Sequence, residues 1–186
     1  SYVSQRVDPD LEFTIVNGDG SAVKPGDTVC ELKGKTQSIL TAERTVLNFM
    51  QRLSGIATVT RSFTRLVEHT SAKILDTRKT TPGWRSLEKA AVLDGGGVNH
   101  RMGLYDAVMV KDNHLVANPE PIDLAQSIAD LKKEMPQLKI EVEADHLTQV
   151  ESFLPITGID VILLDNMSNE ELRSAVTMRD KANSKI

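Results

Sequence analysis

Asp76-Thr-Arg-Lys-Thr-Thr-Pro-Gly-Trp-Arg85 is the stretch around which the rest of the chain is organised. It follows a short apolar run at residues 73–75, which predicts a strand. The stretch then presents Arg78, Lys79 and Arg85 together with threonine hydroxyls, and its Pro-Gly pair predicts a turn. Cations and hydroxyls at this density after a strand indicate a loop that binds an anion.

The order of strand, loop and helix repeats along the chain after this loop. Such alternation predicts an α/β fold with parallel strands. About four strands are visible, which is too few to close a barrel. The predicted strands are residues 73–75, 107–110, 139–143 and 160–164, and the predicted helices are residues 87–93, 122–135, 147–153 and 170–179.

The N-terminal part has a different pattern. Residues 12–16 and 28–32 are strand candidates, and the Gly- and Pro-containing turns between them predict a small β-rich subdomain. Thr41 is a plausible N-cap for the apolar stripe of helical period that follows, which predicts one helix, or two helices broken near Gly55.

The composition limits the classes of function. The chain has 186 residues, 40% of them hydrophobic, so it can bury a real core. Its net charge of -4 argues against a nucleic-acid-binding protein. Cys30 is the only cysteine, which excludes an internal disulfide and fits a reducing, cytoplasmic compartment. Nothing in the sequence approaches the roughly 20 apolar residues of a membrane span.

A set of cationic side chains follows the predicted strands. In parallel α/β folds, functional groups gather where strands end. Each of these residues taken alone is better explained as a surface charge, but the set favours a site for a polyanionic small molecule. Its members are Arg78, Lys79, Arg85, His100, Arg101, Lys111 and His114.

A second set is acidic, and it consists of Glu141, Glu143, Asp165 and Asp76. Glu141 and Glu143 point to the same face of their strand because side chains alternate along a strand. Carboxylates near bound phosphates hold Mg²⁺ or stabilise an electron-poor sugar carbon. Structural pairing with Lys or Arg is the alternative.

The Gly95–Gly97 run matches neither a dinucleotide-binding motif nor a P-loop. It predicts either a close approach of the backbone to a ligand or a loop that moves. His100 and His114 have no partner at metal-ligand spacing, so we expect them to form hydrogen bonds or to position a ligand.

Six motifs in order resemble those of the quinolinate phosphoribosyltransferase family. Each motif alone is only suggestive, but their order and spacing across residues 12–179 are specific. They are Thr41-Ala-Glu-Arg-Thr-Val-Leu-Asn-Phe-Met-Gln-Arg-Leu-Ser-Gly-Ile-Ala-Thr58, Thr77-Arg-Lys-Thr-Thr-Pro-Gly-Trp-Arg85, Gly95-Gly-Gly-Val-Asn-His-Arg-Met-Gly-Leu104, Lys111-Asp-Asn-His114, Glu141-Val-Glu143 and Leu163-Leu-Asp-Asn166.

The resemblance implies a fold and a reaction. The fold would be a portion of an irregular α/β barrel, residues 70–186, after a small N-terminal α+β, sandwich-like subdomain with connecting helices, residues 1–69. The reaction would convert quinolinate and phosphoribosyl pyrophosphate into nicotinate mononucleotide, pyrophosphate and CO₂ in NAD biosynthesis, with Mg²⁺ as cofactor. The expected assembly is a homodimer or larger homo-oligomer, with no nucleic-acid or membrane partner.

The resemblance also implies roles for individual residues. Arg78, Arg101 and Lys111 match family positions that bind the two carboxylates of quinolinate, with His100 beside them. Lys79 matches a phosphoribosyl pyrophosphate contact and is expected to be catalytic.

Glu143 and Asp165 match the acidic pair near the ribose and the metal, so catalytic and metal-binding roles are expected for both, directly or through water or substrate. Glu141 fits the family spacing less well. From the sequence pattern alone, Arg44 and Arg52 are interpreted as solvated charges on a helix face. The resemblance reverses this for Arg44, which matches an arginine that enters the site of the neighbouring subunit.

The family chain is longer at both ends, so we expect this chain to be a partial copy. Trp84 also stands where an aliphatic residue is commoner. Two alternatives stay open. One is a phosphoribosyltransferase for another base, although three cations suit a dicarboxylate better. The other is a non-catalytic module that binds a dicarboxylate or serves assembly.

Overall fold

The computed structural model describes residues 2–111, 123–182 and 186. Its contacts divide the chain into two compact units, Ser1–Met102 (unit 1) and Gly103–Ile186 (unit 2). Within the described ranges, no helix is both long and apolar enough to cross a membrane.

Unit 1 opens with a short helix and a β-hairpin. Helix α1 (Tyr2–Val7), which the sequence did not predict, precedes strands β1 (Glu12–Ile15) and β2 (Cys30–Lys33). The two strands pair antiparallel, with Glu12 opposite Lys33. Both predicted N-terminal strands are therefore confirmed, with shifted ends.

Helix α2 (Thr36–Val67) is the longest element of unit 1. The predicted start at Thr41 is wrong, because the Thr41 hydroxyl lies inside the helix and donates to the Gln37 carbonyl oxygen at 2.8 Å. Of the two predicted alternatives, one continuous helix is confirmed and a break near Gly55 is wrong. A lone glycine costs a helix only about 1 kcal/mol relative to alanine, and α2 packs against both α1 and α3.

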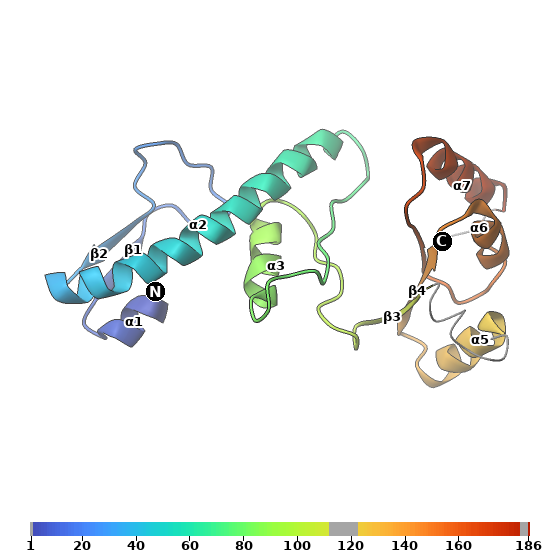
Figure 1. The fold of residues 1–186 in the computed structure, drawn as a ribbon, viewed down its shortest axis with the longest axis horizontal. Helices are drawn as coiled ribbons and strands as arrows, with labels where there is room; N and C mark the ends of the chain where they lie inside the picture. Colours follow the sequence, from blue (N-terminus) through green and yellow to red (C-terminus); the bar gives the residue numbers. More distant parts are fainter. Residues whose placement is uncertain (1, 112–122, 183–185) are drawn as a thin grey trace. The chain divides into compact units, whose positions relative to one another are not determined.

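Helix α3 (Arg85–Asp94) packs closely on the second half of α2 (Figure 1). A Cβ atom on Gly95 would lie 2.5 Å from the Ala57 carbonyl oxygen and 2.6 Å from Thr60 Cβ. Gly95 therefore serves close contact between the helices, and the ligand approach or loop motion predicted for the whole run stays a prediction. The predicted strand at residues 73–75 is reduced to one parallel bridge between Leu75 and Val98.

In the residues that the structure describes, unit 2 combines a parallel sheet with helices (Figure 1). The strand order is β3 (Ala107–Val110), β4 (Lys139–Ala144) and β5 (Val161–Leu164). Helices α5 (Leu124–Glu134), α6 (Leu147–Phe153) and α7 (Asn169–Lys181) follow the strands in turn. These elements confirm the α/β prediction.

The core of unit 2 lies on one face of the central strand. Ile140, Val142 and Ala144 are fully buried and belong to one apolar cluster with Val150 and Phe153 of α6. Their alternation leaves the glutamates of β4 on the opposite face. This central position explains why β4 delivers acidic side chains to a defined place.

Candidate functional site

The loop at residues 76–85 is held by its own last residue. Arg85 donates to Thr80 Oγ1 at 3.2 Å, to the Met102 carbonyl oxygen at 3.1 Å and to the Arg78 carbonyl oxygen at 3.3 Å. The sequence left open whether Arg85 contacts a ligand or pairs within the protein. Arg85 donates to groups of the loop and to Met102 of the same unit, so its role is structural.

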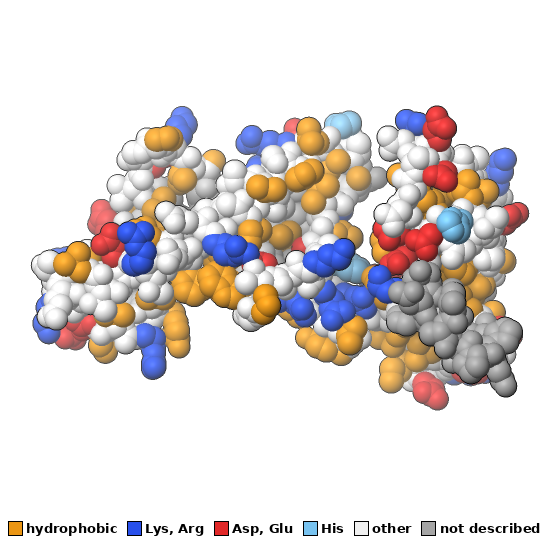
Figure 2. Space-filling view, viewed as in Figure 1, with side chains coloured by type: hydrophobic (Ala, Val, Ile, Leu, Met, Phe, Trp, Pro, Cys, Tyr) orange, Lys and Arg blue, Asp and Glu red, His pale blue; other side chains and the backbone are white. Residues whose placement is uncertain are grey.

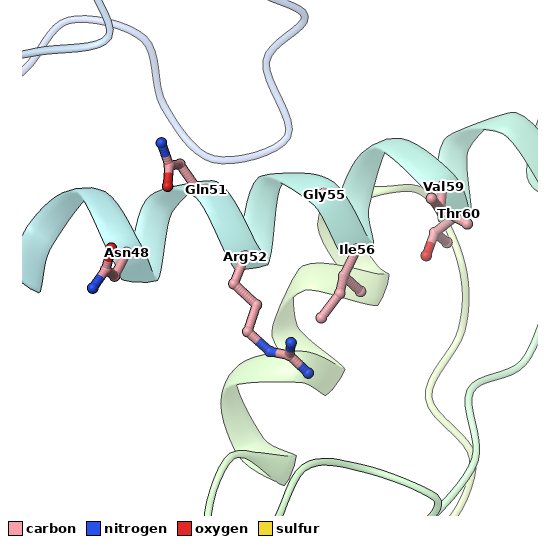
Figure 3. A pocket seen from close by; sticks show the side chains of 7 residues that line it. All are labelled: Asn48, Gln51, Arg52, Gly55, Ile56, Val59 and Thr60. Atoms are coloured by element: carbon pink, nitrogen blue, oxygen red, sulfur yellow. The ribbon is translucent and has the colours of Figure 1, made fainter.

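A second support comes from α2. Arg52 Nε and Nη2 donate to Glu88 Oε1 at 3.1 and 2.7 Å, and Figure 3 shows Arg52 extending from α2 toward α3. Glu88 in turn accepts from the Thr81 hydroxyl at 2.7 Å and from the Thr81 backbone N–H at 3.2 Å. Hydrogen bonds from Arg52, then Thr81, hold the pKa of the Glu88 carboxyl below its ordinary value. The interpretation of Arg52 as a solvated surface charge is therefore wrong.

Trp84 completes this support. Its ring stacks on Phe49 with centroids 4.6 Å apart and planes 14° apart. The Arg52 guanidinium lies 5.9 Å from the Trp84 centroid, which is cation–π range. Trp84 therefore anchors the loop on α2, a role that the commoner aliphatic residue would fill without the cation–π contact.

Arg78 and Lys79 differ from their neighbours in having unused charges. In the part of the chain that the structure describes, Arg78 Nε is buried without a hydrogen-bond partner, and neither side chain forms an ion pair. The Lys79 backbone N–H donates to Thr77 Oγ1 at 3.1 Å. Lys79 itself is exposed. A buried, unsatisfied guanidinium nitrogen is costly, and an anionic ligand would satisfy it.

His100 and Arg101 lie on a second loop that contacts the first. The His100 backbone N–H donates to Asp76 Oδ1 at 2.8 Å. Asp76 was considered as a member of the acidic set, but its carboxylate is buried and paired with Lys89. Asp76 therefore does not join the acidic set, and it links the loop of Arg78 and Lys79 to the loop of His100 and Arg101.

Basic side chains cluster on the surface around α3 and the loops that flank it, whereas acidic side chains form a group on unit 2 (Figure 2).

A separate pocket lies along α2 between Asn48 and Thr60 (Figure 3). All residues that line the pocket belong to α2, and none of them is a predicted ligand contact. The pocket is therefore distinct from the candidate anion site.

Unit 2 gathers its predicted residues at the carboxyl edge of the sheet. Lys111 follows β3, Glu143 lies near the end of β4, and Asp165 follows β5. The Lys111 ammonium donates to Glu143 Oε2 at 2.7 Å, and only 8% of the Glu143 side chain is exposed. The prediction that successive strand ends bring these residue types together holds for this unit.

One acidic residue was missed from the sequence. Ligand oxygens of Glu143, Asp145 and Asp165 all lie within 4.8 Å of one another. Asp145 follows Glu141 and Glu143 at the two-residue period of a strand face, so the alternation that identified the glutamates also indicated it. Asn166, in the left-handed backbone region, donates to Asp165 Oδ2 at 3.1 Å and orients that carboxylate.

These carboxylates fit a hard cation such as Mg²⁺. Oxygen is the ligand atom that Mg²⁺ prefers, and Mg²⁺ bound with phosphates needs only one or two protein carboxylates. Lys111 balances part of the charge on Glu143. The chemistry of the donor set therefore suits a cation shared with a phosphorylated substrate.

Two predicted features lie apart from these groups. Arg44 is exposed on α2, and among the described residues it has no ion-pair partner. His114, with the two residues before it, lies outside the described residues.

An α/β fold with cations and carboxylates at its strand ends is typical of enzymes that bind phosphorylated or carboxylated small molecules. Residues 2–54 match the N-terminal domain of quinolinate phosphoribosyl transferase, and residues 56–186 match its C-terminal domain. The chain therefore belongs to the quinolinate phosphoribosyltransferase family.

Individual relatives agree with this assignment. The chain is 41% identical over 182 residues to a probable nicotinate-nucleotide pyrophosphorylase (carboxylating) of Synechocystis sp., covering 97% of this chain and 60% of the relative. It is 43% identical over 162 residues to the nicotinate-nucleotide pyrophosphorylase (carboxylating) of Mycobacterium leprae, covering 87% of this chain and 56% of the relative.

Solved structures confirm the fold. NadC from Streptococcus pyogenes matches with a TM-score of 0.86 at 39% identity, covering 97% of this chain and 63% of that chain. The nicotinate-nucleotide pyrophosphorylase from Francisella tularensis matches with a TM-score of 0.86 at 40% identity, covering 96% and 62%. The chain thus spans about 60% of the length of such relatives. The domain boundary predicted between residues 69 and 70 stays a prediction.

Proposed function

We propose that the protein transfers the phosphoribosyl group of phosphoribosyl pyrophosphate to quinolinate with decarboxylation, as a nicotinate-nucleotide diphosphorylase (carboxylating). Nicotinate mononucleotide, pyrophosphate and CO₂ are the products, and NAD biosynthesis in the cytoplasm is the setting. The observation that carries the proposal is the unused charge of Arg78, whose buried Nε has no partner, on a loop joined to His100 and Arg101.

Cations bind the acceptor in this proposal. Quinolinate has two carboxylates, and an arginine fork binds a carboxylate through two parallel hydrogen bonds. Arg78, Arg101 and Lys111 supply the positive charge, and His100 lies beside Arg101. A monocarboxylate would need fewer cations, which argues against another pyridine base.

Carboxylates serve the donor. As the bond from the ribose carbon to pyrophosphate breaks, positive charge develops on the sugar, and Glu143 and Asp165 stabilise it electrostatically. Lys79 contacts the phosphoribosyl pyrophosphate and balances the charge of the leaving pyrophosphate. Glu143 and Asp165, together with Asp145, would hold Mg²⁺ directly or through water or substrate, and the ion would supply charge neutralisation for the pyrophosphate.

Decarboxylation follows transfer. The quinolinate ring nitrogen forms the new bond to the ribose carbon and becomes positively charged. The bond between the ring and the adjacent carboxylate then breaks, its electron pair stays on the ring carbon beside that cationic nitrogen, CO₂ leaves, and the carbon takes a proton. No protein nucleophile is needed.

We further propose that the protein is a homodimer or larger homo-oligomer in which Arg44 enters the site of the neighbouring subunit. Arg44 is exposed and has no ion-pair partner among the described residues of its own chain. An unpaired, exposed arginine on a long helix is suited to a contact made in trans.

The reaction is tested by mixing the protein with quinolinate, phosphoribosyl pyrophosphate and Mg²⁺ and measuring nicotinate mononucleotide by chromatography. Formation of that product supports the proposal. Product from nicotinate in place of quinolinate would indicate a transferase for another base. Tight binding of quinolinate without product would indicate a binding module.

A further inference from the structure

A buried ion pair connects the loop of Arg78 and Lys79 with the loop of His100 and Arg101 in unit 1. Lys89 Nζ and Asp76 Oδ1 are 2.5 Å apart, and their side chains are only 1% and 6% exposed. Lys89 comes from α3, whereas Asp76 stands two positions before Arg78. The family motifs that suggested ligand contacts do not assign either residue a role.

Both partners of the pair also bind the backbone of His100 in the second loop. The backbone N–H of His100 donates to Asp76 Oδ1 at 2.8 Å, and the carbonyl oxygen of His100 accepts from Lys89 Nζ at 2.9 Å. With its amide oriented by its hydrogen-bond partners, Asn99 donates to Asp76 Oδ2 at 2.7 Å and to the Lys89 carbonyl oxygen at 2.9 Å. Two successive residues of the loop are thereby fixed before Arg101.

Stability alone is a poor explanation for this arrangement. A buried ion pair is often worth no more than apolar residues of similar volume, because desolvation offsets the attraction. What the pair does provide is a fixed geometry, since it makes hydrogen bonds to both the N–H and the carbonyl group of His100. The backbone before Arg101 is thus held against the backbone before Arg78.

We propose that Asp76 and Lys89 are positioning residues that set the spacing between Arg78 and Arg101, and with it the selectivity for a dicarboxylate. This inference rests on the proposed function. The two carboxylates of quinolinate are a fixed distance apart on a rigid ring, so two guanidinium groups bind both only if their own spacing is fixed. A monocarboxylate does not need two guanidinium groups at a fixed spacing.

The test compares Lys89→Met with a matched control. Lys132 of α5 forms a more exposed pair in unit 2, donating to Asp160 Oδ2 at 2.8 Å and to the Leu138 carbonyl oxygen at 2.8 Å. Lys132→Met therefore removes a lysine with the same two kinds of partner. Binding of quinolinate and of nicotinate is measured by calorimetry for the wild-type protein and both variants, with the melting temperature of each.

The expected result is a loss of selectivity in one variant only. Lys89→Met weakens quinolinate binding about tenfold or more but nicotinate binding less than about threefold, because misplacement of one cation affects only the ligand that needs both. Lys132→Met leaves the ratio of the two affinities unchanged. A change in overall stability would lower both affinities together and leave that ratio constant.

A second variant guards against misfolding. Asp76→Asn/Lys89→Met removes both buried charges, so no unpaired charge is left inside, and its affinity ratio is expected to fall like that of Lys89→Met because the His100 carbonyl group is no longer held. A folded variant with the wild-type ratio would overturn the positioning role. A wild-type protein that binds quinolinate no better than nicotinate would overturn the proposed function, and this role with it.

Discussion

Four cationic side chains lie in or near the loop at residues 76–85, but their donors differ in whether they have partners within the protein. They are Arg52, Arg78, Arg85 and Lys89. Arg85 donates hydrogen bonds to Thr80, Met102 and Arg78. Lys89 and Arg52 are paired with carboxylates. Arg78 has a buried nitrogen without a partner. The residues with satisfied donors hold the loop in place, and we propose that Arg78 binds the ligand.

A pair of alanine substitutions separates these roles. Arg78→Ala is expected to weaken quinolinate binding about ten- to hundredfold with little change in melting temperature, because a charged hydrogen bond to the ligand is lost. Arg85→Ala is expected to lower the free energy of unfolding by about 1–3 kcal/mol, because several internal hydrogen bonds are lost. Calorimetry and urea unfolding measure the two effects. Unchanged quinolinate affinity in Arg78→Ala would remove Arg78 from the site.

Asp145 allows a test of the acidic group. Asp145→Asn is expected to raise the Mg²⁺ concentration needed for half-maximal activity about tenfold, because one of the neighbouring carboxylates is neutralised. Asp180→Asn is the control, since Asp180 is exposed and pairs with Arg179 on α7. Equal Mg²⁺ requirements in the two variants would show that Asp145 has no part in holding the ion.

At the scale of elements, the contact between α2 and α3 positions the cationic loop. This contact depends on Gly95, where a Cβ atom would meet the Ala57 carbonyl oxygen at 2.5 Å. Gly55 lies within α2 itself, and a Cβ atom there would meet nothing within 4 Å. The two glycines therefore predict opposite results.

Gly95→Ala is expected to destabilise the protein by about 1–3 kcal/mol, because the backbone of α2 must shift to admit the methyl group. Gly55→Ala is expected to stabilise it by about 0.5–1 kcal/mol, because alanine favours a helix interior. Thermal unfolding of both variants checks these signs. A stabilising Gly95→Ala substitution would show that the helices do not meet as described.

The Arg52–Glu88 contact predicts a dependence on pH. The folded state lowers the pKa of Glu88 below its ordinary value of 4.5, chiefly through the hydrogen bond from Arg52. A lowered pKa means that the contribution to stability is present above the unfolded value and is lost as the pH falls through the folded value.

Glu88→Gln is therefore expected to be less stable than the wild-type protein near neutral pH, and the difference should shrink as the pH falls below 4.5. Urea unfolding followed by Trp84 fluorescence measures the difference, because Trp84 lies beside Arg52. A difference that stays constant with pH would mean that the ionised form of Glu88 does not stabilise the fold.

At the scale of the whole molecule, the exposed Arg44 predicts complementation between subunits. Arg44→Ala and Glu143→Ala are each expected to be inactive. Mixed after unfolding and refolding together, they should regain about a quarter of the wild-type activity, because half of the dimers are mixed and each has one intact site. Activity assays before and after mixing check this. No recovery from well-folded mixed dimers would place Arg44 outside the partner's site.

The sequence by itself determined the elements of unit 2 and the residue types of the site. Helix α6 has the predicted bounds, and β4 the predicted position, because apolar periodicity and turn signals are local properties of the chain. The two-residue alternation also placed Glu141 and Glu143 on one face. The same alternation, extended by two residues, includes Asp145.

The tertiary structure alone decided which charges are free. The pairing of Asp76 with Lys89 and His100, of Arg52 with Glu88, and the unbroken course of α2 past Gly55 depend on segments distant in sequence. Hydrogen-bond satisfaction is a property of the folded neighbourhood, so local pattern identified the cations but did not tell ligand-binding residues from structural ones.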